Sequence, residues 1–277
     1  MSEQTIDKSA DVDLDAQERA VVEERQRLRA PVVYEIICQQ GVEELERPAS
    51  SLWWSGVAAG IAISTSVYCE AFIHAHLPDA AWRPLIENFG YCVGFVIVIM
   101  GGFQLFTEQT VTAVLPVLAS PTKKNFRGTA RLWSIVFAAN MAGTFFAALM
   151  ALVIGWVDAK QLEATLEVAR HFAENDTLAI FLLGMPAGFF VAALVWILPA
   201  SRGSEFWLIV LLTYMIALGD LTHVVAGSTE VFLLLLVGEQ SPTRAVFGII
   251  IPALIGNVIG GTVLFSMIAY AQVKEEM

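Results

Sequence analysis

The segment LGDLTHVVAGSTE, which runs from Leu218 to Glu230, gathers the side chains with the greatest capacity for chemistry. It places Asp220, His223 and Glu230 between two strongly apolar runs, WLIVLLTYMIA and VFLLLLV. Ionisable groups are expensive in apolar surroundings, and where they occur there they normally line a path for ions, protons or solutes. His223 is also the side chain of this segment that can gain or lose a proton near neutral pH. The segment therefore predicts a polar, functional interruption of an apolar element.

The elements around this segment are apolar enough to cross a membrane. The chain is 56% hydrophobic and has a mean hydropathy of +0.64, above the apolar share of an ordinary soluble domain. A spanning helix needs about 20 mostly apolar residues, and six regions meet that requirement: 52–74, 89–118, 132–157, 177–200, 205–237 and 246–272. We predict an all-α polytopic membrane protein with six transmembrane helices. The second and fifth regions are long and carry polar residues, so we expect both to be broken.

Basic residues predict the orientation of these spans. The connection between spans two and three, SPTKKNFRGTAR, is rich in Lys and Arg, and Arg202 and Lys274 lie on the same side of the predicted topology. Cytoplasmic loops carry an excess of Lys and Arg, so we predict that both termini are cytoplasmic. The expected domains are an N-terminal tail at 1–49, a transmembrane domain at 50–272 and a C-terminal tail at 273–277.

The N-terminal tail has a helical pattern of its own. Residues 15–46 mix charged side chains with Val, Leu, Tyr and Ile, which is typical of an amphipathic helix, and Pro31 either interrupts or starts it. Residues 1–14 are acidic and polar, and we predict that they are disordered. The helix is expected to lie along the cytoplasmic face or to pack beneath the spans.

Two pairs of motifs indicate an internal repeat. Asn140-x-x-Gly143-Thr144 in span three matches a second motif 117 residues later, which begins at Asn257 in span six. Nearly the same shift lays GFQLFTEQT in span two over GDLTHVVAG in span five. Three spans separate the members of each pair, so the halves must have opposite orientations. An inverted 3+3 repeat with helices broken near the midplane is an architecture of transporters and channels.

The repeat suggests how broken helices are held inside the protein. Non-helical backbone at membrane depth is tolerated only where protein or a water-filled cavity satisfies it. We interpret Asn140 and Asn257 as side chains whose amides bond the broken segments. Close helix packing through the neighbouring glycines is the alternative reason for these motifs.

Four segments resemble the formate/nitrite transporter family, and QQGVEELERP and LGDLTH are most similar to its YfdC-like branch. The four segments are GFQLFTEQTVTAVLP, RLWSIVFAANMAG, LTHVVAG and IPALIGNVIGGTVL, and the likeness extends over about residues 30–272. The resemblance implies an aquaporin-like protomer with one pore, assembled as a homopentamer in the inner membrane. Members of the family pass small monovalent anions or their acids, such as formate, nitrite and hydrosulfide. The implied partners are further copies of the chain, membrane lipid and a small monovalent solute, with no nucleic acid.

The resemblance also implies which residues line the solute path. Thr107, beside Leu105 and Phe106, would face His223 at the centre of the pore. Apolar constrictions would be formed by Tyr91, Phe95 and Ile216.

Several positions depart from the family pattern. The usual Glu before the pore histidine is Thr222, a downstream Asn is Gly227, and an Asn in span four is Gly188. An entrance residue that is usually basic aligns with Phe172. Glu108 and Asp220 add carboxylates near the expected breaks, and such acids lower the local potential for anions. A cation or a neutral solute is therefore an alternative, as is a non-conducting membrane scaffold or sensor.

The polar side chains near the breaks have two possible roles. His223 would share a proton with a weak-acid solute, or it would only hold the broken helix through a hydrogen bond. Asp220, Glu230 and Glu108 would cap the half-helices that follow the breaks. Otherwise these acids would attract cations or relay protons, and Thr222 belongs with them as a residue that tunes the pore.

Other chemistry is not indicated. His74 and His76 are two residues apart and do not share a helix face, so with Asp79 they do not predict a metal site. The cysteines show no zinc or disulfide spacing. No nucleotide fingerprint or Ser/His/Asp set is present in the sequence, so we expect a protein that is not an enzyme and that uses no cofactor.

The predicted topology can be tested by labelling. The connection at 158–176 lies outside the cell if both termini are cytoplasmic and six spans intervene. A tag placed there should react with an impermeant reagent in intact cells. A tag that reacts only after the cytoplasmic face is opened would contradict the topology.

Overall fold

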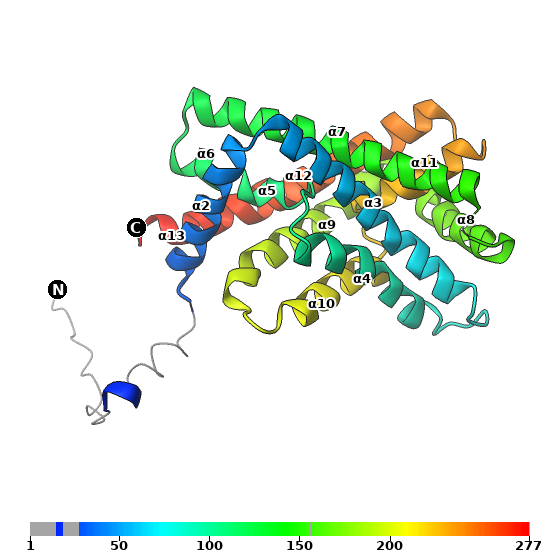
Figure 1. The fold of residues 1–277 in the computed structure, drawn as a ribbon, viewed down its shortest axis with the longest axis horizontal. Coiled ribbons are helices and arrows are strands. Elements are labelled where there is room, and N and C mark those ends of the chain that lie inside the picture. The colour runs from blue at the N-terminus through cyan, green and yellow to red at the C-terminus, as the bar shows by residue number, and fades with distance from the viewer. Residues whose placement is uncertain (1–14, 19–27, 156, 277) are drawn as a thin grey trace.

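A computed structural model describes residues 15–18, 28–155 and 157–276, and these residues contain helices and connections but no strand (Figure 1). Before the final span, the helices are α2 (Ala30–Glu46), α3 (Ala49–His74), α4 (Pro84–Met100), α5 (Gln109–Thr112), α6 (Leu115–Ala119), α7 (Lys123–Ile154), α8 (Ala159–Glu174), α9 (Thr177–Ile197), α10 (Glu205–Leu218) and α11 (Val224–Leu236). A 3₁₀ turn at Leu198–Ala200 extends α9. The final span combines α12 (Ile251–Val258) and α13 (Met267–Lys274) with π-helical turns at Arg244–Ile250 and Ile259–Ser266.

Four of the described helices are long and apolar enough to cross a membrane. They are Ala49–His74, Lys123–Ile154, Thr177–Ala200 and Arg244–Lys274. The shorter apolar helices Pro84–Met100 and Gln109–Ala119 occupy the second predicted region, and Glu205–Leu218 and Val224–Leu236 occupy the fifth. The two regions with polar interruptions are therefore divided into half-helices in the structure.

The two interruptions have matching backbone conformations. Helix α4 ends at Met100, and Gly102 then takes a left-handed conformation with φ of 64°. Helix α10 ends at Leu218, and Asp220 takes the same left-handed region with φ of 49°. Glycine adopts this region without steric cost, and Asp tolerates it better than most residues. Each helix is therefore stopped by a residue suited to the turn that ends it.

Glycines bring two pairs of helices into close contact. A Cβ on Gly60 of α3 would lie 2.9 Å from the Cα of Gly143 on α7. A Cβ on Gly256 of α12 would lie 3.0 Å from the Cα of Gly184 on α9. Small residues at such crossings let helix backbones approach closely in apolar surroundings. The glycines therefore contribute close packing as well as the backbone freedom used at the breaks.

The connection that we treated as a loop at 158–176 contains a helix. Asp158 and Gln161 form a capping box, in which the Asp158 carboxylate accepts the Gln161 N–H at 2.8 Å. The buried face of α8 includes Ala164, Leu166 and Ala169, and it packs on α11 and α3. This segment carries many charges, so its average hydropathy did not reveal the apolar face of the helix.

The described part of the N-terminal tail is integrated into the bundle. Helix α2 starts at Ala30, carries Pro31 in its first turn, and buries Tyr34 and Ile37. A Cβ on Gly41 would run into the carbonyl of Thr112 and would lie 3.0 Å from Cδ of Pro116. Helix α2 therefore packs beneath the spans, which is one of the two placements we expected. Residues 1–14, predicted to be disordered, and 19–27, within the predicted helix, lie outside the described residues.

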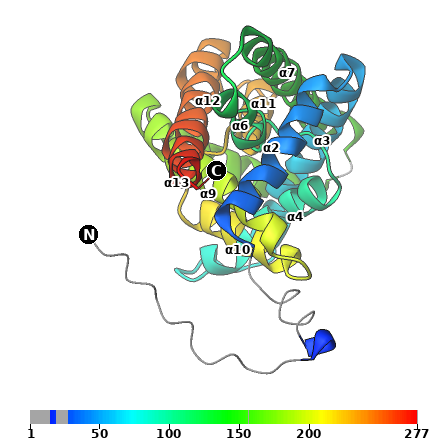
Figure 2. The same ribbon diagram turned by 90° about the vertical axis from the view of Figure 1, so that its left-hand side faces the viewer.

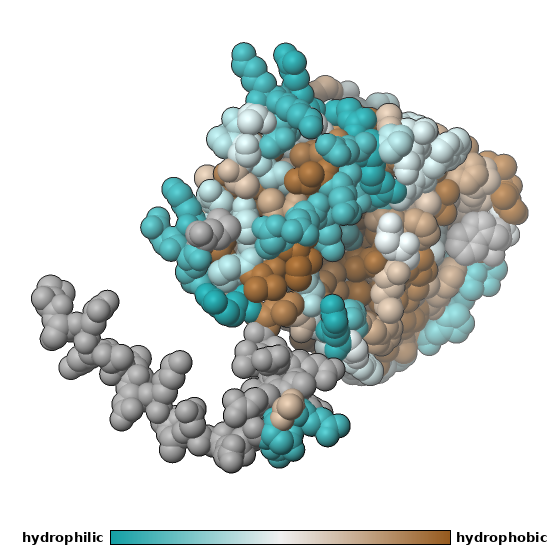
Figure 3. All heavy atoms as spheres, turned by 60° about the vertical axis from the view of Figure 1, so that its left-hand side comes forward, coloured by the Kyte–Doolittle hydropathy of each residue, from teal (hydrophilic) through white to brown (hydrophobic). Residues whose placement is uncertain are grey.

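The ends of the bundle differ from its sides. In Figure 1, α2 and the C-terminal helix α13 lie at one end, and α8 lies at the other. Figure 2 views the first end, with the long helices receding behind α2 and α13. Hydrophilic side chains gather on this end in Figure 3, and hydrophobic side chains form the wall behind it. Such a wall is what a helical bundle presents to lipid.

The packing of α2 predicts different effects of two deletions. Removing residues 1–29 should leave assembly and thermal stability nearly unchanged, because among the described residues it removes an exposed ion pair of Arg29 with Glu276 and the Arg29 carbonyl that accepts two N–H groups at the start of α2, but no buried side chain. Removing residues 1–46 should lower the melting temperature clearly, because it uncovers Val111, Leu115 and neighbouring apolar side chains. Both variants can be compared in mild detergent by size-exclusion chromatography and thermal unfolding. Loss of all membrane-inserted protein on the shorter deletion would contradict this account.

Candidate functional site

Thr107 and His223 meet at the centre of the bundle. The Thr107 Oγ1 lies 2.8 Å from the His223 Nε2, and both side chains are at most 1% exposed. Thr107 lies in the interruption before α5, and His223 directly precedes α11. The two interruptions, which are distant in sequence, therefore present one polar side chain each to a common point.

The other ring nitrogen of His223 determines where its proton lies. Nδ1 accepts a hydrogen bond from the backbone N–H of Ala226 at 3.2 Å, so His223 is the N-cap of α11. An accepting nitrogen carries no hydrogen, and the proton of a neutral imidazole must then be on Nε2. The N–H of Nε2 is therefore directed at the Thr107 hydroxyl. His223 holds the broken helix and also presents a proton donor at the centre.

Apolar side chains surround this pair. Phe95, Leu105 and Ile216 are each 0% exposed. The Phe95 ring approaches the His223 ring edge-on, with centroids 5.0 Å apart. The Phe106 ring, which we expected beside the pore, packs on Trp133 and Phe137 of α7, at centroid distances of 5.7 and 5.2 Å. The central polar pair therefore borders a buried apolar cluster that includes Phe95, Leu105 and Ile216, which we call the collar.

Two asparagines bond the interrupted backbones in the same way. The Asn140 Oδ1 accepts the Phe106 N–H at 2.9 Å, and its Nδ2 donates to the carbonyls of Gln104 and Gly56 at 2.9 and 2.8 Å. Asn140 is 0% exposed. Each amide hydrogen and the amide oxygen of this side chain therefore has a backbone partner.

Asn257 repeats this pattern in the second half. Its Oδ1 accepts the Val224 N–H at 2.9 Å, and its Nδ2 donates to the carbonyls of Thr222 and Gly184 at 2.8 and 2.9 Å. In each half the asparagine bonds a carbonyl of the break, the N–H two residues later and a glycine carbonyl of a long helix. The loop-holding interpretation of the two asparagines thus has a direct geometric basis.

The threonines of the two motifs connect the halves. The Ser228 hydroxyl of α11 donates to Thr144 Oγ1 at 2.9 Å, and the Thr262 hydroxyl donates to the Thr110 carbonyl at 3.0 Å. Each motif therefore holds one interruption through its asparagine and contacts the other broken helix through its threonine.

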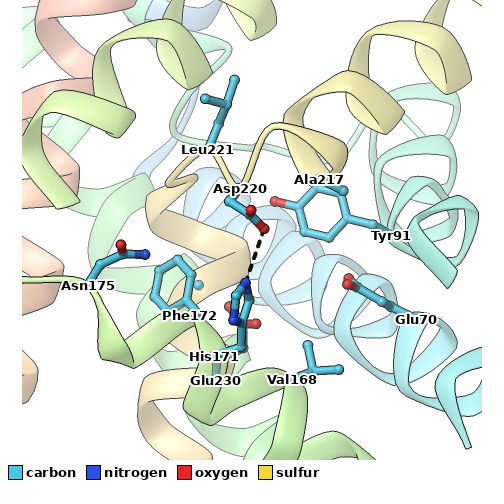
Figure 4. A pocket seen from close by; sticks show the side chains of 11 residues that line it. Glu70, Tyr91, Val168, His171, Phe172, Asn175, Ala217, Asp220, Leu221 and Glu230 are labelled. Carbon is cyan, nitrogen blue, oxygen red and sulfur yellow. Dashed lines mark hydrogen bonds and ion pairs between the residues drawn. The ribbon is translucent and has the colours of Figure 1, made fainter. Parts of the chain in front are cut away.

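A cavity of about 60 Å³ lies on the α8 side of the collar (Figure 4). Glu70 of α3, Tyr91 of α4 and Asp220 point toward it from different elements, and His171 reaches Asp220 from α8 at 3.3 Å. The complete lining is Glu70, Tyr91, Val168, His171, Phe172, Asn175, Ala217, Asp220, Leu221, Gly227 and Glu230. We call this space the outer vestibule.

A larger cavity of about 600 Å³ lies on the α2 side. Gln104 and Glu108 of the first interruption and Gln109 of α5 line it together with α2 and Arg202. We call this space the inner vestibule. The Thr107–His223 pair and its apolar collar therefore lie between two polar cavities.

The acids near the breaks do not cap the half-helices, which was one of the two roles that the sequence left open. His223 caps α11, whereas the Asp220 carboxylate faces outward, 65% exposed, toward His171. Glu230 lies within α11, and Glu108 precedes α5 without a capping bond from its side chain. Asp220 does not cap α11 because His223, three residues later, holds the N-cap position.

The departures from the family pattern have packing explanations. The Phe172 ring occupies the space that a side chain on Gly227 would need. A Cβ on Gly188 would enter the backbone of Asn257. The buried Thr222 hydroxyl has no hydrogen-bond partner among the described residues, while its carbonyl is held by Asn257.

Two arginines lie near the outer vestibule: Arg244 bonds the Asn175 carbonyl and the Thr177 hydroxyl, whereas Arg170 is bound to acids. Arg170 bonds Glu239 through Nε and Nη2 at 2.7 and 2.9 Å, and it bonds Glu163 through Nη1 at 2.8 Å. These bonds raise the pKa of Arg170 above its ordinary value and lower the pKa of Glu239. Arg170 is therefore neutralised locally and does not replace the basic entrance residue.

The histidines at the end of α3 make ordinary polar contacts. His74 lies 2.9 Å from both Glu87 and Glu167 through its two ring nitrogens. His76 contacts the Phe72 carbonyl at 2.7 Å. The described residues contain no group of His, Cys, Asp or Glu with the geometry to hold a metal ion.

Sequence reasoning missed Glu70. It lies inside the predicted span 52–74, where a single acid among apolar residues was a usable signal. Its approach to Glu230 and Tyr91 depends on the crossing of three helices, which the sequence does not specify.

Known proteins share this architecture. The family model described as "Formate/nitrite transporter" matches residues 31–271. Inner membrane protein YfdC of Escherichia coli (strain K12) is 34% identical over 284 residues, which cover 100% of this chain and 92% of that protein. A solved "FNT family ion channel" superimposes with a TM-score of 0.74 at 18% identity, over 88% of this chain and 98% of that one. A "Pentameric formate channel with formate bound" superimposes with a TM-score of 0.69 at 18% identity, over 82% and 98%.

These likenesses and the geometry define a helical membrane protein of the transporter and channel class. The chain belongs to the formate/nitrite transporter family.

The matching asparagines predict matching losses of stability. Asn140→Ala and Asn257→Ala should each lower the free energy of unfolding by about 3 kcal/mol or more, because each leaves buried backbone groups without partners at about 1–3 kcal/mol apiece. Asn125→Ala is the control on α7, since its amide bonds the Pro116 and Ser120 carbonyls near the helix start. It should cost about 1 kcal/mol. Equal losses in all three variants, measured by denaturant unfolding in detergent, would contradict the role of the asparagines.

Proposed function

We propose that this chain forms a membrane pore for a small monovalent solute, with its constriction at Thr107 and His223. The observation that carries the proposal is the buried 2.8 Å contact between these side chains, with a polar cavity on either side. Leu105, Phe95 and Ile216 would form the apolar gate around it, with Tyr91 at its outer side. Family membership supports transport as the class of activity.

The proposed protomer has six spans in an aquaporin-like inverted 3+3 arrangement, with spans two and five broken. The equivalent bonds of Asn140 and Asn257 support a repeat that relates the two halves. The pore domain would extend over 50–272, between cytoplasmic tails at 1–49 and 273–277. The placement of α2 and α13 at one end of the bundle supports tails on one side (Figure 1).

The proposed solute is a weak acid such as formate or nitrite. The family description and the fold likeness to a pentameric formate channel support this class. The same likeness supports a homopentamer with a pore in each protomer. The E. coli relative, described as an inner membrane protein, supports the inner membrane as the location.

The proposed mechanism lowers the cost of crossing the apolar collar. A bare anion pays several kcal/mol or more to leave water for such surroundings. The solute would bring its own proton, His223 would share its Nε2 proton with one solute oxygen in a hydrogen bond, and the Thr107 hydroxyl oxygen would accept a hydrogen bond from the solute's hydroxyl. A solute that is uncharged at this point crosses the collar at a much lower cost.

The second candidate function is a pore of the same fold that conducts a cation or a neutral solute. Glu70 and Glu230 face the outer vestibule, Glu108 faces the inner one, and Phe172 stands where the family usually has a basic residue. These carboxylates favour species without negative charge.

Replacing the central histidine tests the proposed pore. His223→Asn should keep the cap of α11, because Asn is a favourable N-cap residue, and should cost about 1 kcal/mol for the lost contact with Thr107. Formate flux into proteoliposomes should fall about tenfold or more, since about 1.4 kcal/mol of barrier is a factor of ten.

The control for this variant is Ser134→Ala, an exposed position whose hydroxyl bonds only its own helix at Ala130. It should leave flux unchanged. Wild-type flux in a folded His223→Asn variant would contradict the central role of the histidine. Wild-type protein that passes no solute would favour the scaffold or sensor alternative.

A further inference from the structure

The inner vestibule has the size of a ligand site, and its lining carries more acids than bases. Its volume of about 600 Å³ lies in the range of pockets that take small organic molecules. Four carboxylates and one guanidinium line it, namely Glu43, Glu44, Glu108, Glu205 and Arg202. Arg47 bonds Glu44 at 3.0 Å, whereas the other three acids form no ion pair among the described residues. The cavity therefore attracts cations.

Two buried oxygen atoms of this cavity have no hydrogen-bond partner. The Oε1 atoms of Glu108 and Gln109 are buried and lack a partner among the described residues. Gln109 is 4% exposed, and its Nε2 donates to the Gln104 Oε1 at 3.0 Å, so the amide oxygen is the end left over. Buried polar atoms normally have a partner, and an exception calls for a ligand or a solvent molecule. Two acceptors without a donor point to a ligand that donates hydrogen bonds.

The rest of the lining combines apolar side chains with acids nearer to solvent. The apolar side chains are Ile36, Ile99, Phe103, Val195, Leu198 and Pro199. Glu43 on α2 is exposed, and Glu205 at the start of α10 is half-buried, so these two acids form a rim. A ligand that suits this lining has more than one cationic donor, with apolar spacers between the donors.

These requirements select a class of ligand. A metal ion does not fit, because the described residues contain no group of His, Cys, Asp or Glu with the geometry to hold one. An ammonium group does fit, since it carries a positive charge and three hydrogen-bond donors. A single ammonium group would serve either the buried acceptors or the rim. Several ammonium groups on one methylene chain serve both, and the methylenes contact the apolar lining.

We infer that the inner vestibule binds a linear aliphatic polyamine. One ammonium group bonds Glu108 and Gln109, and another pairs with Glu43 and Glu205 at the rim. The bound chain occludes the α2 side of the collar, because Gln104 and Glu108 flank the residues that the first interruption contributes there. A multiply charged chain does not cross apolar surroundings, so the polyamine is a plug and not a transported solute. The binding is independent of the proposed pore, whereas the occlusion rests on it.

Calorimetric titration with spermidine, a linear triamine, tests the binding. Full-length protein in an uncharged detergent at fixed ionic strength should bind spermidine saturably. 1-Aminobutane, which has a single ammonium group, should bind about tenfold more weakly or worse, because it leaves one set of acceptors unpaired.

Variants of the lining test where spermidine binds. Glu108→Gln should weaken binding about tenfold or more, because it removes the buried carboxylate and keeps the size of the side chain. The double variant Glu43→Gln/Glu205→Gln tests the rim independently, also if Glu108→Gln does not fold, and should weaken binding about threefold or more.

Glu35→Gln is the matched control for these variants. It removes the same charge from α2, but Glu35 lies outside the cavity and accepts a hydrogen bond from Gln39 Nε2 at 2.6 Å. Its affinity for spermidine should stay within about twofold of the wild type.

Formate uptake tests the occlusion. Full-length protein is placed in phosphatidylcholine vesicles with spermidine on both faces, so that either orientation of the protein meets it. At about ten times the Kd, uptake by the wild type and by Glu35→Gln should fall about tenfold, in proportion to the unoccupied fraction.

The outcomes separate the binding site from the pore. No saturable binding, or the same affinity in the wild type and in both lining variants, would overturn the site. Displacement of spermidine by an equal concentration of Mg²⁺ would also overturn it, because charge alone would then account for the binding. Binding without slower uptake would overturn the occlusion. Protein that passes no formate even without spermidine would contradict the proposed pore, while calorimetry would still decide the site.

Discussion

The structure depends on hydrogen bonds that satisfy the non-helical backbone inside an apolar bundle. Each interruption exposes peptide groups that a continuous helix would have paired, and leaving them unpaired in such surroundings costs several kcal/mol per group. Asn140 and Asn257 each supply one acceptor and two donors to these groups, at distances of 2.8 to 2.9 Å. The close approach of Gly60 to Gly143, and of Gly184 to Gly256, lets the helices that carry and accept these bonds come together.

The site follows from the two interruptions. Because each helix stops near the centre, Thr107 and His223 can project from chain ends toward one point, which a side chain on a continuous helix face would reach less directly. His223 caps α11 through one nitrogen and meets Thr107 through the other, so one residue holds the break and supplies the polar centre. The vestibules are the two cavities that residues next to the interruptions line together with neighbouring helices.

The sequence predicted much of this arrangement through composition and repetition. The apolar regions located the long helices, and the polar residues within the second and fifth regions located the interruptions. The asparagine motifs predicted the hydrogen bonds of Asn140 and Asn257 to the interrupted backbone, since a buried amide near broken backbone has few other partners. The pairing of Thr107 with His223 came from family resemblance, because residues so distant in sequence carry no local sign of contact. Helix α8, the outward direction of Asp220 and the approach of Glu70 to Glu230 needed the structure, since each depends on backbone conformation or helix crossings.

The central claim is that solute passes between Thr107 and His223, and chemical blocking at that point tests it most directly. In protein whose native Cys38, Cys69 and Cys92 are replaced by alanine, Thr107→Cys would place a thiol in the collar. Formate flux into proteoliposomes is then measured before and after reaction with a small methanethiosulfonate, with the extent of modification determined by mass spectrometry. The account predicts that flux stops in proportion to the modified fraction. Undiminished flux through fully modified protein would contradict it.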